Sequence, residues 1–434
     1  MKQLTRLFIP ICLETLFYML SGMVDTLMLS AVGDYAVGAV GTANSYIGIF
    51  IIMFSIISSG MVSVMTQNIG AGRPGVAYQA RQLGLLFNAV AGVLMAVFLF
   101  SGAGAILRMV GIADALYEPA LIYLKIVGGG CILNAVIPIF SSYLRAFGYT
   151  KQPLYATIVG NIANFVMNAV FLFVLHKGVA GVAAATVISK ILNLCIVLYF
   201  SHKLISAKNS TERIANKTVL GKIVKVGLPS ACETALYNVA MMLVIRFLNQ
   251  MDAEGLNVTA RSYTATISNF SYCVGAALAQ ANAIMTGWHI GAGELEECDR
   301  GTKRAAFVGV CVAVCMETAI VLGSGFIMPL FTDNPEMTAL VRKLLAIDIV
   351  LEIGRVTNLV FGQALKTSGD AVFPAVIAAV FMFVFAVGGT WLFGISMGLM
   401  AVGAYIGLAS DECVRAVGMV WRWKTGKWRT KKLV

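Results

Sequence analysis

Carboxyl and amide side chains recur inside long apolar stretches of this sequence, where polar groups are costly. Glu14 and Asp25 lie about three helical turns apart and therefore share one face of a helix. Further along, Asn161, Asn164 and Asn168 follow the i, i+3, i+7 spacing of a polar stripe. Carboxylate and amide oxygens bind hard cations, and a carboxyl also takes up protons. Cation binding is one explanation; structural pairing and interhelical hydrogen bonding is the other.

A second group of charges lies in the later part of the chain. Asp348, Glu352 and Arg355 are spaced i, i+4, i+7, and Glu352 lies within pairing reach of Arg355. A buried salt bridge that fixes packing is one explanation. The other is a cavity whose acidic groups attract cationic molecules. We predict that Glu352 and Arg355, together with Glu14 and Glu233, line such a cavity or couple ion movement to it.

Charged residues also interrupt three further apolar segments. Asp411, Glu412 and Arg415 lie within pairing reach of one another on one helical face. We predict that these three form a structural charge cluster. Lys190 and Glu317 also lie near the middle of apolar segments, and the sequence names no partner for either.

The elements that position these residues are long apolar helices. Hydrophobic residues make up 59% of the 434 residues and charged residues 12%, whereas soluble domains carry about 25% charged residues. Apolar runs of about 20 residues, long enough to cross a membrane, occur throughout. We predict an all-α polytopic membrane protein with about twelve transmembrane helices. The expected spans are residues 7–31, 43–66, 83–107, 120–143, 154–175, 179–200, 226–249, 261–286, 304–327, 338–364, 372–393 and 397–421.

The sequence repeats itself once. The phrase Pro10–Tyr18 recurs at Pro229–Tyr237 with the same Pro, Glu-Thr and Tyr positions. Leu144–Pro153 recurs at Leu365–Pro374 at nearly the same offset. Internal repeats of this kind are typical of secondary transporters. We predict two six-helix lobes of like orientation, related by the repeat.

Most of the costly polar residues are not mirrored by this repeat. Glu14 matches Glu233, which favours a role in the shared architecture. Asp25, by contrast, falls opposite Val244, and Asn168 falls opposite Gly389. Residues that only held the fold could have been used in both halves, so each lobe's own polar centre indicates function.

The polar stretch between the sixth and seventh spans suggests the division of the chain. We predict an N-lobe at 1–200, a cytoplasmic linker at 201–225, and a C-lobe at 226–434 that ends in a basic cytoplasmic tail. Lys and Arg concentrate in alternate loops, as they do on the cytoplasmic side of membrane proteins. We therefore expect a multi-pass protein of the plasma (inner) membrane with both termini cytoplasmic.

Several other classes fit the sequence poorly. The net charge of +11 is explained by basic cytoplasmic loops, so we expect membrane lipids and no nucleic acid as partners. The three His and nine Cys show no metal-ligand spacing, which predicts no metal beyond a possible sodium ion at Asp25. The motifs of phosphate loops and zinc proteases are missing from the sequence, which argues against a membrane enzyme.

Several motifs together resemble the MATE (multidrug and toxic compound extrusion) family of the MOP flippase superfamily. The resemblance extends over essentially the whole chain, and the order and spacing of the motifs carry it. The motifs are Val24–Thr26, Gln67–Gly72, Leu144–Gly148, Leu351–Asn358, Gly369–Asp370 and Asp411–Arg415.

This resemblance implies an antiporter that exports organic cations or amphipathic drugs, driven by inward sodium or protons. Its two lobes would form a V around a central cavity and alternate between outward and inward openings. The family's N-lobe cation site maps onto Asp25, Asn164, Asn168 and Thr186. Family members often have Asp at the position of Asn168, so this chain has one negative charge fewer. We expect a monomer that acts on a small-molecule substrate and needs no cofactor besides the coupling ion.

One rival function belongs to the same superfamily. A lipid-linked oligosaccharide flippase would need a strongly basic cavity to hold pyrophosphate. In this sequence the acidic residues within the apolar segments outnumber the basic ones, which favours the antiporter.

Overall fold

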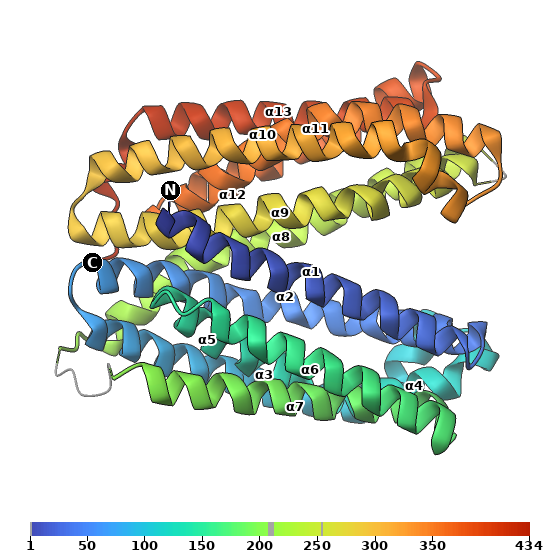
Figure 1. Ribbon diagram of the computed structural model, residues 1–434, viewed down its shortest axis with the longest axis horizontal. Coiled ribbons are helices and arrows are strands. Elements are labelled where there is room, and N and C mark those ends of the chain that lie inside the picture. The colour runs from blue at the N-terminus through green and yellow to red at the C-terminus, as the bar shows by residue number, and fades with distance from the viewer. Residues whose placement is uncertain (1, 207–211, 253–254) are drawn as a thin grey trace. The chain divides into compact units, whose positions relative to one another are not determined.

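The computed structural model describes residues 2–206, 212–252 and 255–434, and every regular element among them is a helix (Figure 1). The first half contains α1 (Lys2–Ser30), α2 (Asp34–Gly70), α3 (Pro74–Val110), α4 (Asp114–Gly129), α5 (Cys131–Ala146), α6 (Lys151–Ala169) with the π-helix Val170–Val174, and α7 (Gly178–Leu204). The second contains α8 (Asn216–Met251), α9 (Leu256–Ala292), α10 (Leu295–Ile327), α11 (Pro335–Ser368), α12 (Val372–Phe381) with the π-helices Met382–Val387 and Thr390–Ser396, and α13 (Met400–Lys424).

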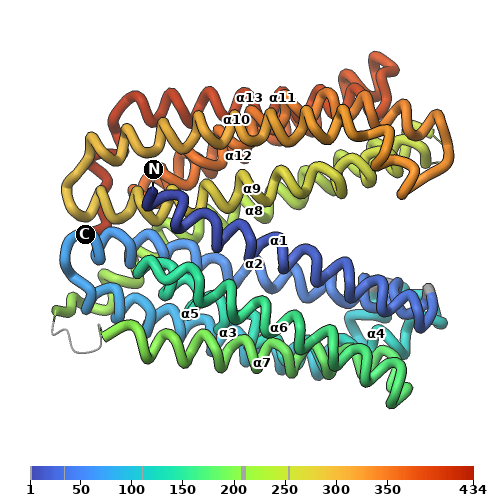
Figure 2. Tube along the Cα trace, viewed as in Figure 1, coloured from blue at the N-terminus to red at the C-terminus, as the bar shows by residue number. Residues whose placement is uncertain are grey.

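The expected spans are all helical, and the trace in Figure 2 follows them from α1 to α13. Eight helices of the described chain are long and apolar enough to cross a membrane. The pair α4 and α5, bent by 41°, makes a ninth span. The other three expected spans are α9, α11 and α13, and α11 and α13 contain most of the buried charged residues. Together they form the twelve predicted transmembrane helices.

The chain forms two compact units, each with its own core. One unit is Ile9–Gly227, and the other is Met1–Phe8 with Leu228–Val434. Many large apolar side chains face outward, among them Phe98 and Phe326, which suits contact with lipid tails. The expected linker 201–225 is in part helical, because α8 already begins at Asn216.

Glycines allow α2 and the start of α8 to cross with their backbones almost touching. A side-chain carbon on Gly60 would overlap the carbonyl oxygen of Ile223, and one on Gly227 would overlap that of Ile56. Neither obstacle can rotate away, because both are backbone atoms. Only glycine fits this crossing, which is a common device for bringing membrane helices close together.

We expect Gly60→Ala to destabilise the protein by at least about 1–3 kcal/mol, the usual cost of overpacking. Gly48→Ala is a matched control, because it lies on the same helix with no atom within 4 Å of an added side-chain carbon. Alanine is the better helix former, so the control should be neutral or slightly stabilising. Thermal unfolding of the purified variants measures both effects. Equal unfolding temperatures for the two variants would contradict the close crossing.

The C-terminal segment is attached to the second unit by its side chains. Trp423 and Trp428 stack with ring centroids 4.2 Å apart. Asp370, between α11 and α12, accepts a 2.7 Å hydrogen bond from Arg422 Nε and a 2.8 Å bond from Lys431 Nζ. The expected basic tail is therefore folded against the helices at this point.

These bonds make a pH-dependent contribution to stability. Burial alone would raise the pKa of Asp370, but its bonds with Arg422 and Lys431 outweigh burial and hold that pKa below its ordinary value. The stabilisation is therefore complete above the unfolded pKa, about 3.9, and is lost as the pH falls through the lower native pKa. We expect Asp370→Asn to cost about 2 kcal/mol at neutral pH. The difference from the natural chain should shrink in acid. Thermal unfolding across this pH range tests it, and a difference that does not depend on pH would contradict it.

Candidate functional site

The first unit brings three predicted site residues together in its interior. Asp25 on α1 accepts a 2.8 Å hydrogen bond from Asn168 Nδ2 on α6. The same amide nitrogen lies 3.1 Å from the Oδ1 atom of Asn164, one turn earlier. Both asparagines are buried, and the Oδ1 atom of Asn168 has no hydrogen-bond partner among the described residues. The spacing on α6 thus holds two amides beside one carboxyl.

Thr186 and Lys190 occupy successive turns of α7. The Thr186 hydroxyl donates to the carbonyl of Val182 at 2.9 Å. Lys190 donates from Nζ to Oδ1 of Asn134 on α5 at 2.9 Å. Its ammonium also interacts electrostatically with the Asp25 carboxylate. The first unit therefore adds an internal cation to the predicted cluster.

Glu14 lies in a separate ion pair. Its Oε1 atom is 2.6 Å from an Nη2 atom of Arg145 on α5, and it also accepts a 3.5 Å hydrogen bond from Thr157 on α6. The matched residue of the second half behaves alike, because Glu233 lies 2.8 Å from Nζ of Lys366. Arg145 and Lys366 are themselves matched by the repeat. The same carboxylate–base pair thus joins the first and fourth spans of each half.

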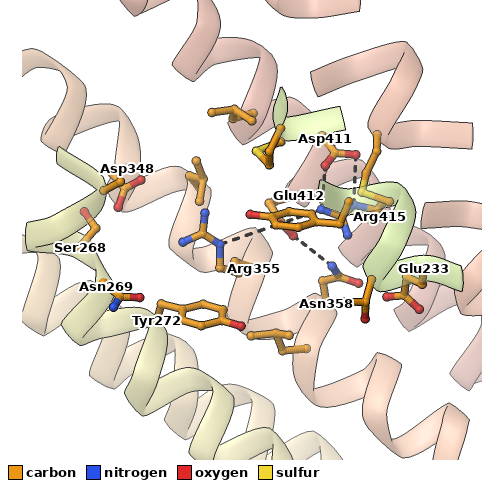
Figure 3. Close-up of a pocket in the computed structure, with 18 of the residues that line it drawn as sticks. Glu233, Ser268, Asn269, Tyr272, Asp348, Arg355, Asn358, Asp411, Glu412 and Arg415 are labelled. Carbon is orange, nitrogen blue, oxygen red and sulfur yellow. Dashed lines mark hydrogen bonds and ion pairs between the residues drawn. The ribbon is translucent and has the colours of Figure 1, made fainter. Parts of the chain in front are cut away.

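The second unit encloses a cavity of about 470 Å³, shown in Figure 3. Its walls come from α8, α9, α11, α13 and the π-helix Met382–Val387. Four acidic and four basic residues line it, so its formal charge is balanced. These residues are Glu233, Asp348, Asp411, Glu412, Arg261, Arg355, Lys366 and Arg415.

An ion-pair network crosses this cavity between α11 and α13. Arg355 bonds to Glu352 on its own helix, and its Nε atom lies 3.7 Å from Oε1 of Glu412. Arg415 lies 2.7 Å from Asp411 Oδ2 and 2.8 Å from Glu412 Oε1. Glu412 therefore connects the two guanidinium groups, as Figure 3 shows.

The predicted residues of the second half are divided between the cavity wall and its surroundings. Glu233 and Arg355 line the cavity, whereas Glu352 is fully buried behind it. The expected structural cluster Asp411–Arg415 forms the predicted ion pairs and also lines the cavity. The paired side chains thus fix the packing and set the charge of the wall.

Two charged residues inside apolar segments, Lys190 and Glu317, have neighbours that the sequence did not predict. Lys190 follows Thr186 by one helical turn, and this spacing was the available signal for its place in the first unit. Glu317 on α10 is fully buried near Asp348 and Glu352. Its neighbours lie on another helix, so spacing along its own segment could not reveal them.

Twelve transmembrane helices in two related halves, with charged residues inside both, have the architecture of a secondary transporter. The MatE family model matches residues 10–170 and 229–392, one match in each half. The chain belongs to the MatE family of transporters.

Relatives agree with this assignment. The chain is 33% identical over 428 residues to the uncharacterized transporter YisQ of Bacillus subtilis, covering 97% of this chain and 94% of that protein. It is 20% identical over 446 residues to a probable multidrug resistance protein NorM of Thermotoga maritima, covering 100% and 94%. The solved structure of a mutant of the Vibrio cholerae MATE transporter VcmN superposes with a TM-score of 0.88 at 17% identity, covering 99% and 98%. At that identity the superposition shows the fold alone.

Proposed function

We propose that this transporter is a cation-coupled antiporter that exports organic cations or amphipathic drugs by alternating access. The observation that carries the proposal is the cluster of Asp25, Asn164 and Asn168 inside the first unit. A carboxyl at this depth costs about 2.5–3.5 kcal/mol even on the lenient insertion scale, so it needs a functional or pairing role. The name of the Thermotoga relative, a multidrug resistance protein, supports export of drugs.

The surroundings of Asp25 favour a proton over sodium as the coupling ion. Asn168 turns its amide nitrogen, a donor, toward the carboxylate. The nearby Lys190 ammonium already supplies one positive charge. Sodium needs several oxygen ligands. A proton needs only the carboxyl itself.

Protonation would act by changing the contacts between helices. A neutral Asp25 loses its attraction to Lys190, and its new O–H group can donate to the Oδ1 atom of Asn168 once that amide turns. The contact of α1 with α6 then changes, which biases the transporter toward one of its two openings. Moving one elementary charge across the membrane is worth about 2.3 kcal/mol per 100 mV, enough to drive such a change.

The cavity of the second unit supports small organic substrates. Its acidic and basic residues are equal in number and mostly paired with one another. It therefore lacks the strong positive charge that a pyrophosphate-linked lipid demands. We propose that the transporter acts as a monomer in the plasma (inner) membrane, with both termini cytoplasmic and no cofactor besides the coupling ion.

The test is efflux of ethidium from everted vesicles under proton and sodium gradients that are imposed separately. Efflux that follows the proton gradient supports the proposal. Efflux that follows only sodium would overturn the choice of ion. If neither gradient drives ethidium, transport of a lipid-linked oligosaccharide should be measured next, because the flippase would then be the better candidate.

A further inference from the structure

The Glu317 side chain on α10 has no role in any ion pair described above. It is fully buried, and neither of its carboxyl oxygens makes a hydrogen bond with good geometry among the described residues. The hydroxyl of Ser271 on α9 faces it but lies outside bonding geometry. An ionised carboxylate in such a place is strongly destabilising, and buried carboxyls usually become neutral instead.

The groups around Glu317 are mainly acidic. Asp348 and Glu352 face it from α11, and each keeps one carboxyl oxygen without a hydrogen-bond partner among the described residues. Arg355, also on α11, interacts with Glu317 as a basic group. Arg355 is already bonded to Glu352 and paired with Glu412 on α13.

Charge balance then requires a further cation. Three buried carboxyls that repel one another share part of one guanidinium, so they cannot all be ionised at neutral pH. A bound metal is one solution in general. No three Asp, Glu, His or Cys side chains of the described ranges are placed to hold one, however. A proton balances the cluster without further ligands.

The cluster also has a connection to water. Asp348 lines the cavity of the second unit, whereas Glu317 and Glu352 do not. Figure 3 shows Asp348 at the cavity wall beside Ser268 of α9. A proton from cavity water can therefore reach Asp348 first. As the O–H bond of Asp348 breaks, one forms on Glu317, and Asp348 returns to its carboxylate form.

We propose that Glu317 is a second proton-binding site, in the second unit, which exchanges protons with the cavity through Asp348. Its contribution to coupling rests on the proposed antiport function, whereas proton binding itself does not. The first unit would then bind one proton at Asp25, and the second unit would bind one at Glu317. The repeat does not match these two positions.

Infrared spectroscopy of the protein in lipid tests this directly, because a protonated carboxylic acid has its own C=O stretching band. We expect this band to be present at neutral pH and to disappear as the pH rises. Glu317→Gln should lose the amplitude of one carboxyl, whereas the exposed control Glu118→Gln should match the natural chain. Asp348→Asn should keep the Glu317 band but slow its exchange in deuterated water.

Two outcomes would overturn the proposal. One is an unchanged band in Glu317→Gln, and the other is a band that sodium removes at constant pH, which would indicate a sodium site. If Glu317→Gln does not fold, Glu317→Asp keeps the carboxyl and should shift the band. The measurement needs no exported substrate. If the natural chain shows the band but no ethidium efflux, the antiport proposal would be rejected and the proton site at Glu317 would stand.

Discussion

Replacement of Asp25 by asparagine should reduce ion-driven efflux to the background of vesicles that lack the protein. Asparagine has nearly the same shape and keeps a hydrogen-bond acceptor for Asn168, so the helices should still pack. It cannot take up a proton, and it removes the negative charge that faces Lys190. The expected loss therefore comes from coupling rather than from folding. Efflux from everted vesicles, together with the amount of folded protein, measures both.

Matched variants sharpen this test. Asp114→Asn removes an exposed carboxyl at the start of α4 and should leave efflux unchanged. Asp25→Glu keeps a titrating carboxyl and should retain part of the activity. Lys190→Gln removes the internal cation, so efflux that begins to respond to sodium would show that the ammonium had excluded it. Normal efflux by Asp25→Asn would reject this carboxyl as the coupling site.

Substitution of Arg415 by methionine should destabilise the second unit by about 3–5 kcal/mol, the usual cost of breaking a buried ion pair. Arg415 is 4% exposed and contacts both Asp411 and Glu412. Without it, Asp411 loses its partner in the network, whereas Glu412 keeps the longer contact with Arg355 and a 3.0 Å hydrogen bond from Nδ2 of Asn358. The two carboxylates would then repel each other inside the protein. Thermal unfolding in detergent or lipid measures the loss.

A second substitution separates charge from packing. Adding Asp411→Asn to Arg415→Met removes the uncompensated charge, so part of the lost stability should return. Val417→Met lies on the same helix at a position 70% exposed, and it should be neutral. If the single and double variants unfold at the same temperature, packing rather than charge would explain the effect of Arg415.

Spacing along the chain predicted the contacts that form within one helix. The one-turn spacing of Asn164 and Asn168 placed their amides together, and the spacing of Glu352 and Arg355 placed their charges in contact. The apolar runs also predicted every span, because lipid demands long apolar segments. These features depend on local periodicity, which follows directly from the order of the residues.

Contacts between distant segments were harder to predict. Glu14 shares a helical face with Asp25, yet it pairs with Arg145 from α5. Glu412 on α13 joins the pair on α11, although nothing near Arg355 in sequence points to it. The surroundings of Lys190 and Glu317 depend on how helices cross, and hydrophobic periodicity does not specify the crossing partner. Only the repeat gave long-range information, and it applied to matched positions alone.

The two matched carboxylate–base pairs indicate that the two halves of the chain share an ancestor. Glu14 and Arg145 belong wholly to the first half, and Glu233 and Lys366 belong wholly to the second. A single ancestral six-helix protein would already have contained both members of such a pair, so the pair predates the duplication. Asp25, Lys190 and Glu317 have no like counterpart at the matched positions. The ancestor thus passed on a shared set of contacts, and the residues of the two proposed proton sites differ between the copies.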